Sequence, residues 1–395
     1  MLEQLAARYR TFLRQPDVVV MLATALLTRM PLGTVGFSML MHLRDISGSF
    51  ATAGATGGTY LASSAVFAPV LGRIVDRHGP RWPLVSCAIV CPLALLVILF
   101  ARNLQPSAWQ LALAAAIAGA FAPPITVLMR TIWRHRFADE GDRRTAFALD
   151  AVLVELAFTL GPALIGVVIA YASPTAAFAV AWTFVTIAVP VFAVSPALRY
   201  WRHDPDVERH LLGPLTEPKL WLIYAVTALL TFSLGMLEVG YPGFATAAHA
   251  PALAGMLLAV NSAGSAIGGV AFGGLHVTVP IERQLRGTLL LLAVGLALHV
   301  PATTLAVLAA LAFAAGLFIA PSLAAATTLV STHAPMRYAT EAFTWSATFL
   351  IAGVGGGIAF AGELLERTSA SAVFGIAACI ALLAAFAASA LKPHR

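Results

Sequence analysis

Long apolar runs separated by short polar segments recur along the whole chain. Three windows, 156–198, 239–281 and 287–336, contain no Asp, Glu, Lys or Arg. Each is too long for one bilayer crossing, which takes about 20 helical residues, and turn-forming residues near its middle indicate two helices and a turn. The pattern therefore predicts an all-α membrane protein with twelve spanning helices, over approximately residues 18–42, 51–72, 83–101, 107–130, 146–171, 175–194, 220–244, 252–275, 287–302, 304–330, 341–362 and 371–391.

Composition supports this interpretation and excludes a soluble protein. Of 395 residues, 59% are hydrophobic and 11% are charged, whereas soluble domains carry roughly 25% charged residues. The net charge of +6 arises from basic residues spread over many loops, so we expect no nucleic-acid partner. The lipid bilayer is the partner that composition indicates.

The distribution of basic residues predicts the orientation. Short cytoplasmic loops retain Lys and Arg. If both termini lie inside, 20 of the 24 Lys and Arg residues lie in inner segments, and the others are Arg29 and the outer-loop residues Arg44, Arg102 and Arg367. Four tryptophans lie at predicted helix ends, as an interfacial aromatic belt would place them: Trp82, Trp109, Trp133 and Trp221.

Nothing in the sequence indicates an enzyme or a metal protein. Cys87, Cys91 and Cys379 lie within predicted spans without metal-ligand spacing, and the ten histidines form no ligand cluster. The phosphate-binding pattern G-x-x-x-x-G-K-[ST] of ATP-driven pumps does not occur. We therefore expect no catalytic residues, no bound metal and no cofactor.

The chain repeats itself at an interval of about two hundred residues. Residues 54–74 align without gaps on 255–275, 34–37 resemble 238–241, and 118–124 resemble 315–322. Repeats in transporters place a substrate site at their interface. The predicted organisation is a six-helix half over 1–194, a cytoplasmic linker over 195–219 and a second half over 220–395.

The loop after the second predicted span carries a family motif. Its sequence GRIVDRHGPRW, 72–82, resembles motif A of the major facilitator superfamily and lies in the position that family expects. The resemblance implies the twelve-helix major facilitator fold and a working monomer. It also implies a conformational latch in which Asp76 faces the start of the eleventh helix near Glu341, supported by Gly72, Arg77, Gly79 and Arg81.

A second, incomplete resemblance lies in the fifth span. ELAFTLGPALIG, 155–166, is similar to motif C of antiporters through Gly161, Pro162 and Gly166, although Ala157 and Ile165 stand where the family has glycine. That similarity implies an exporter with a Gly-Pro element between the halves; the alternative is a kink present for packing. The arginine of motif B in proton antiporters is replaced by Ala115.

Arg29 is a charge inside an otherwise apolar run, so it needs a partner or a wet surface. At 1.5 Å per residue it lies about 18 Å above Asp17, and Glu155 lies about 14 Å above Ala146. Asp150, only about 6 Å above Ala146, is close enough to be paired by Arg130, Arg143 or Arg144. We therefore predict an Arg29–Glu155 pair, acting as a proton-sensitive switch or as a permanent ion pair.

Other polar residues within the spans are candidates for the substrate cavity. Glu238, about 27 Å above Leu220, is predicted to face an outer cavity and attract cations or protons, or else to extend outward to the interface. Its repeat counterpart by alignment is Thr34, and Tyr60 aligns with Asn261. Tyr241 is interpreted either as an aromatic contact of the cavity or as a packing residue, and with Thr34, Tyr60 and Asn261 it is a candidate for the cavity.

The sequence thus favours a secondary transporter that exports an amphipathic or drug-like compound in exchange for protons. The alternatives are an importer of a small metabolite or anion held by Arg29, and a non-transporting sensor built on a transporter fold. Lys219 and Lys392 are the only lysines, and alanine is abundant. This composition is typical of a GC-rich bacterial genome and predicts the cytoplasmic (inner) membrane of a bacterium.

Overall fold

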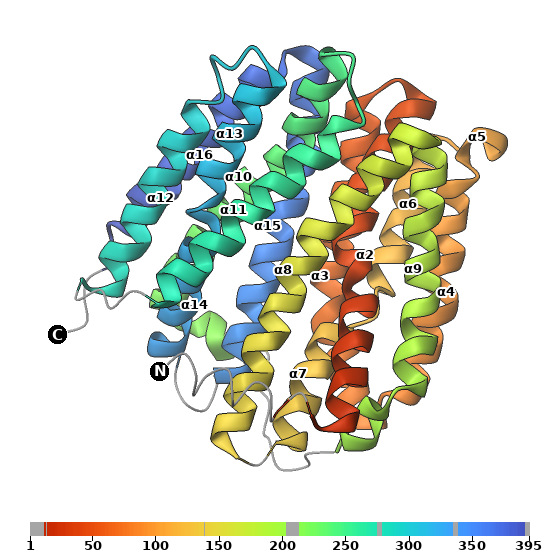
Figure 1. Cartoon of the computed structure of the whole chain (residues 1–395), viewed down its shortest axis with the longest axis vertical. Coiled ribbons are helices and arrows are strands. Elements are labelled where there is room, and N and C mark those ends of the chain that lie inside the picture. The colour runs from red at the N-terminus through yellow and green to blue at the C-terminus, as the bar shows by residue number, and fades with distance from the viewer. Residues whose placement is uncertain are drawn as a thin grey trace.

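The computed structural model is a bundle of long helices that run roughly along one axis (Figure 1). It describes residues 12, 14–137, 139–202, 213–274, 279–334 and 339–391, except for the side chains of a few helical residues, and these residues contain no strand. The predicted first half contains α2 (Pro16–Ser47), α3 (Phe50–His78), α4 (Arg81–Leu99), α5 (Ala101–Leu104), α6 (Ala108–Ala120), α7 (Ile125–Arg136), α8 (Glu140–Tyr171) and α9 (Pro174–Val194). The rest contains two short 3-10 turns, η1 (Pro196–Tyr200) and η2 (Gly213–Thr216), followed by α10 (Pro218–Ala247), α11 (Leu253–Gly274), α12 (Ile281–Ala297), α13 (Leu305–Gly316), α14 (Ile319–His333), α15 (Ala339–Arg367) and α16 (Ala370–Ala388).

Every span that the sequence predicts contains helix. Within the described residues, eleven helical stretches are long and apolar enough to cross a membrane. The predicted span 287–302 corresponds to α12, which has 17 residues and begins with charged side chains. Several helices begin or end beyond the predicted bounds, because a helix continues through polar residues after it has left the apolar layer.

Two predicted spans are each divided into two helices. The fourth is broken between α6 and α7 at Pro123 and Pro124, which cannot donate backbone hydrogen bonds. The tenth is broken between α13 and α14 at Leu317 and Phe318. Both breaks lie in the segments 118–124 and 315–322, which the internal repeat aligns.

Backbone contacts within each half follow the same repeat. A Cβ on Gly119 of α6 would touch the carbonyl oxygen of Tyr60 in α3, and a Cβ on Gly316 of α13 would touch that of Asn261 in α11. In both cases only glycine allows the two backbones to approach so closely. The gap-free alignment of α3 with α11 therefore corresponds to equivalent packing.

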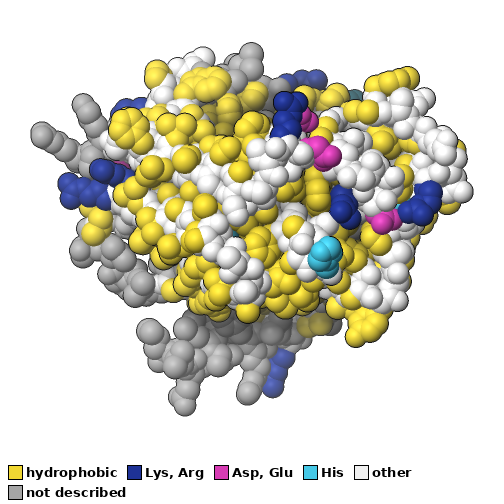
Figure 2. Space-filling view, turned by 90° about the horizontal axis from the view of Figure 1, so that it is seen from above, with side chains coloured by type: hydrophobic (Ala, Val, Ile, Leu, Met, Phe, Trp, Pro, Cys, Tyr) yellow, Lys and Arg dark blue, Asp and Glu magenta, His cyan; other side chains and the backbone are white. Residues whose placement is uncertain are grey.

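We name the two ends of the bundle by the predicted orientation: the outer end carries Ser49 and Thr368, and the inner end carries Gly79 and Tyr200. Seen from the outer end, the surface is mostly hydrophobic, and its few acidic side chains lie near basic ones (Figure 2). Two such exposed pairs are Arg102 with Asp45 and Arg367 with Glu363.

Helices of the two predicted halves contact one another mainly through α3 with α15 and α8 with α11. A Cβ on Gly54 of α3 would lie 3.0 Å from the Cα of Gly362 in α15, and a Cβ on Gly255 of α11 would lie 2.8 Å from the Cα of Gly166 in α8. These glycines lie near the outer ends of their helices. The outer ends of the halves are therefore packed backbone against backbone.

Candidate functional site

Arg29 and Asp150 form a buried ion pair between α2 and α8. The Arg29 Nη2 atom lies 2.6 Å from the Asp150 Oδ1 atom, and the two side chains are 0% and 1% exposed. Arg29 also donates from Nη1 to the carbonyl oxygen of Ala25, at 3.3 Å. A guanidinium and a carboxylate can share such an apolar site because each neutralises the other.

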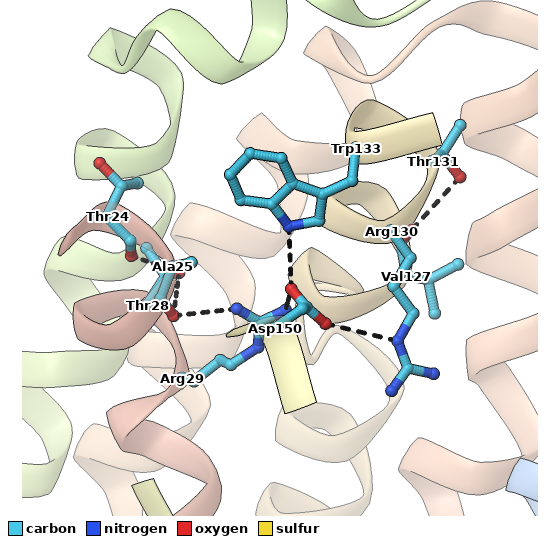
Figure 3. A network of polar contacts seen from close by, with 9 residues as sticks. All are labelled: Thr24, Ala25, Thr28, Arg29, Val127, Arg130, Thr131, Trp133 and Asp150. Carbon is cyan, nitrogen blue, oxygen red and sulfur yellow. Dashed lines mark hydrogen bonds and ion pairs between the residues drawn. The ribbon is translucent and has the colours of Figure 1, made fainter. Parts of the chain in front are cut away.

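Two residues of α7 complete this polar cluster (Figure 3). The indole Nε1 of Trp133 donates to Asp150 Oδ1 at 3.0 Å. The Arg130 Nε atom lies 3.5 Å from Asp150 Oδ2, and its side chain is 59% exposed. Asp150 thus faces two guanidinium groups and an indole, and these contacts join α2, α7 and α8 in the inner half of the bundle.

The structure gives Arg29 a partner that the sequence did not predict. The depth estimate placed the start of the fifth span at Ala146, but α8 begins at Glu140, so Asp150 lies about 15 Å into the helix. That depth brings it level with Arg29. Arg130 contacts Asp150 as predicted, and Arg29, for which Glu155 was predicted as the partner, contacts it as well. The Glu155 side chain lies outside the described residues, so its pairing with Arg29 stays a prediction.

Trp133 differs from the aromatic belt expected of it. The side chains of Trp82, Trp109 and Trp221 are exposed, whereas Trp133 is 0% exposed and binds Asp150. Sequence position could not separate these tryptophans, because all four lie near helix ends.

We expect Trp133→Phe to lower the free energy of unfolding by about 1.5 kcal/mol, because it removes a hydrogen bond to a charged carboxylate. Chemical denaturation in detergent micelles would measure this. Trp109→Phe, on the exposed surface, is the matched control and should change little. Equal losses in the two variants would show that the indole hydrogen bond adds no stability.

Glu238 lies where α10 of the second half approaches α2 of the first. A Cβ on Gly36 would lie 3.7 Å from its Oε2 atom, and the side chain is partly buried. Among the described residues, no hydrogen bond or ion pair to its carboxylate is found. Glu238 is therefore a lone acid at a contact between the halves.

The packing of the helices also corrects which residue of the first half corresponds to Glu238 in the internal repeat. A Cβ on Gly33 of α2 would touch the carbonyl oxygen of Ala157, and one on Gly235 of α10 would touch that of Val354. Matching these two glycines pairs Glu238 with Gly36 rather than with Thr34. The alignment of 34–37 with 238–241 was thus two residues out of register, and Glu238 faces its own counterpart across the contact.

Thr34 and Tyr241 are not cavity residues in this conformation. Both are 0% exposed; the Thr34 hydroxyl donates to the Met30 carbonyl at 2.8 Å, and the Tyr241 hydroxyl lies 3.1 Å from His299 Nε2. Their place in a substrate cavity in another conformation stays a prediction.

Tyr60 and Asn261 do not meet across the halves through the contacts that the structure describes. The Asn261 amide donates to the carbonyl oxygen of Ala312 at 2.9 Å, within the second half. Tyr60 is partly exposed on α3. Its place in a substrate cavity stays a prediction.

The structure describes part of the motif A loop. Gly79 ends α3 with φ of 82°, a conformation that glycine adopts without strain, and its N–H donates to the carbonyl oxygen of Val75. Arg77 and Arg81 are exposed, and Gly72 faces open space. The side chains of Asp76 and Glu341 lie outside the described residues, so the inner latch stays a prediction.

The motif C-like residues of α8 are divided between two contacts. A Cβ on Gly161 would lie 2.8 Å from the Cα of Gly33, so Gly161 packs within the first half. Gly166 packs against Gly255, across the halves, and Pro162 contributes its carbonyl oxygen to that same contact. The predicted position between the halves is correct for Gly166 and Pro162 but not for Gly161.

Comparisons with known proteins agree with this architecture. The model of the Major Facilitator Superfamily matches residues 21–304. The crystal structure of nucleoside transporter NupG superposes with a TM-score of 0.77 at 14% identity, covering 94% of this chain and 98% of that one. A bacterial homolog of the human lysosomal transporter Spinster, in an inward-facing and occupied conformation, gives a TM-score of 0.65 at 16% identity, covering 97% of this chain and 96% of that one.

No curated protein matches this chain in sequence. The likenesses to solved structures are of fold alone, because their identities are low, whereas the family match extends over most of the chain. It confirms the resemblance that motif A carried and excludes the enzyme classes. The chain belongs to the Major Facilitator Superfamily and is a membrane transporter of small molecules.

Proposed function

We propose that this protein exports an amphipathic or drug-like compound in exchange for protons, by alternating access between two six-helix halves, 1–194 and 220–395. In this proposal α12 also crosses the membrane, which brings the number of spans to twelve, and both termini lie in the cytoplasm of a bacterium. The observation that carries it is Glu238, a lone carboxylate between α2 and α10. An acid at such a contact can change its surroundings whenever the halves move.

The chemistry of Glu238 suits exchange between a proton and a cationic substrate. A carboxylate in an apolar setting without a fixed countercharge is stabilised by binding a proton or a cation. Gly36 opposite leaves space beside it rather than a competing side chain. A cation with an apolar body would match both the acid and the apolar helices around it.

The Arg29 cluster supports a structural role more than a substrate site. The guanidinium is buried and already bonded to Asp150, so a small anion would have to displace an internal carboxylate. This gives little support to an anion importer. Glu155 keeps its predicted part in proton coupling as a proposal.

Accumulation of fluorescent cations, neutral drugs, sugars and nucleosides in efflux-deficient bacteria tests the proposed function. Cells expressing the protein should accumulate less of at least one amphipathic cation, and a proton uncoupler should remove the difference. Uptake down an inward gradient in proteoliposomes would instead favour an importer, with nucleosides as candidates because NupG, a nucleoside transporter, shares the fold. Absence of substrate-dependent proton movement for every compound would favour the sensor.

We expect Glu238→Gln to reduce efflux of a cationic substrate about fivefold while changing efflux of a neutral one little, because roughly 1 kcal/mol of charge attraction is lost. Initial efflux rates from preloaded cells measure this. Glu155→Gln serves as the comparison, since its effect should fall on proton coupling for both substrates. Equal efflux of cationic and neutral substrates by wild type and Glu238→Gln would contradict a substrate-binding role for Glu238.

A further inference from the structure

At the outer end, a carboxylate of the second half contacts the first residues of α3 in the first half. The Oε2 atom of Glu366, at the end of α15, accepts from the backbone N–H of Phe50 at 2.9 Å. It also accepts from the Ser49 hydroxyl at 3.3 Å and lies 3.5 Å from the Ala51 nitrogen. Glu366 thus caps α3 from across the contact between the halves.

This contact has a clear electrostatic basis. The first N–H groups of a helix have no partner within it, and the helix dipole makes that end positive, so an anion there is stabilised. The Ser49 hydroxyl accepts from the Thr52 N–H at 3.2 Å. Glu366 supplies the acceptor for the Phe50 N–H, which Ser49 leaves unpaired.

The internal repeat relates the contact between α3 and α15 to the one between α8 and α11, and the second contact has no carboxylate cap. Glu366 lies four residues after Gly362, and Phe50 lies four residues before Gly54. In the equivalent contact between α8 and α11, those places are held by Ala170, which has no carboxylate, and Pro251, which has no N–H. The carboxylate cap is therefore a property of this pair of helices and does not follow from the shared fold of the halves.

We propose that Glu366 is an outer latch that stabilises the conformation in which the outer end is closed. The inference rests on the alternating access of the proposed function, because opening must separate the outer end of α3 from that of α15 and break the contact. At the inner ends of these same two helices, motif A predicts a second latch, from Asp76 to the start of α15. An acid at each end would then favour opposite states.

Spin-label distances test the latch without any substrate. Asn103 lies in α5 and Thr303 between α12 and α13, and both are exposed. Labels on Asn103→Cys and Thr303→Cys would be measured in nanodiscs by pulsed electron paramagnetic resonance, with Cys87, Cys91 and Cys379 replaced by alanine. We expect Glu366→Ala to raise the ratio of the longer to the shorter distance about fivefold, the equivalent of roughly 1 kcal/mol for a lost helix cap. Glu366→Gln, which keeps one carbonyl acceptor, should give a smaller shift.

Glu363→Ala is the matched control. Glu363 lies one turn earlier on α15 and pairs with Arg367 of the same helix, so its loss removes the same charge without breaking a contact between the halves. An unchanged ratio in Glu366→Ala, or an equal shift in Glu363→Ala, would overturn the latch while leaving transport by alternating access intact. A single distance in every variant and in wild type would refute alternating access, and the latch with it.

Discussion

Asp150→Ala is expected to lower the free energy of unfolding by about 3–5 kcal/mol, because it leaves the guanidinium of Arg29 buried without a counter-charge. The side chains of both residues are almost wholly inaccessible to solvent, and the Trp133 indole would lose its acceptor as well. Chemical denaturation in detergent micelles would measure the loss.

The double variant Arg29→Met/Asp150→Leu separates the cost of an orphaned charge from the value of the pair. Replacing both members of a buried pair with apolar residues of similar size is often close to neutral, so we expect most of the stability to return. Asp45→Ala, which removes the exposed pair with Arg102, should cost at most about 1 kcal/mol. A loss in Asp150→Ala no larger than in Asp45→Ala would show that Arg29 finds water or another partner.

Gly54→Ala is expected to favour the outward-open state by roughly 5- to 150-fold, because overpacking costs about 1–3 kcal/mol in a closely packed contact. The added methyl group would lie 2.7 Å from the carbonyl oxygen of Ile358 and 3.0 Å from the Cα of Gly362. Backbone atoms cannot move aside as a flexible side chain does, so the outer end would not close fully. The distance between labels at Asn103 and Thr303 reports the population, and the transport rate should fall with it.

Gly57→Ala is the control for that variant, one turn further along α3. Its added methyl group would make only ordinary contacts, 3.5 Å from Ile358 Cγ2 and 3.7 Å from Met39 Cε. We therefore expect a distance distribution close to that of wild type. If Gly54→Ala gives the same distance distribution as Gly57→Ala, close approach of the backbones is not what keeps the outer end closed.

Much of the candidate site could be anticipated from residue type alone. Arg29 and Glu238 stand out because a charge within an apolar run is costly unless it has a partner or a function. Their partners could not be obtained in the same way. An error of six residues in the start of α8 was enough to direct attention from Asp150 to Glu155, since each residue adds about 1.5 Å of depth.

The register of the internal repeat could also be predicted only in part from the sequence. The alignment of residues 54–74 with 255–275 matched the packing of Tyr60 and Asn261, because a series of small residues fixes the register. The four-residue match at 34–37 was too short to do so, and it was two residues out of register. Only the close contacts of Gly33 and Gly235 reveal that Glu238 faces Gly36.

The sequence by itself determined that this chain is a multi-helix membrane transporter of the major facilitator type, and it predicted the orientation. These are local properties: the length of an apolar run, the charge of a short loop and the pattern of motif A are each read within one segment. The tertiary structure decided that Asp150 forms the ion pair with Arg29, that Trp133 donates a hydrogen bond to Asp150, and that Glu366 caps α3. Those contacts join segments distant in sequence, and they depend on where each helix begins and how it is rotated against its neighbours, which packing sets.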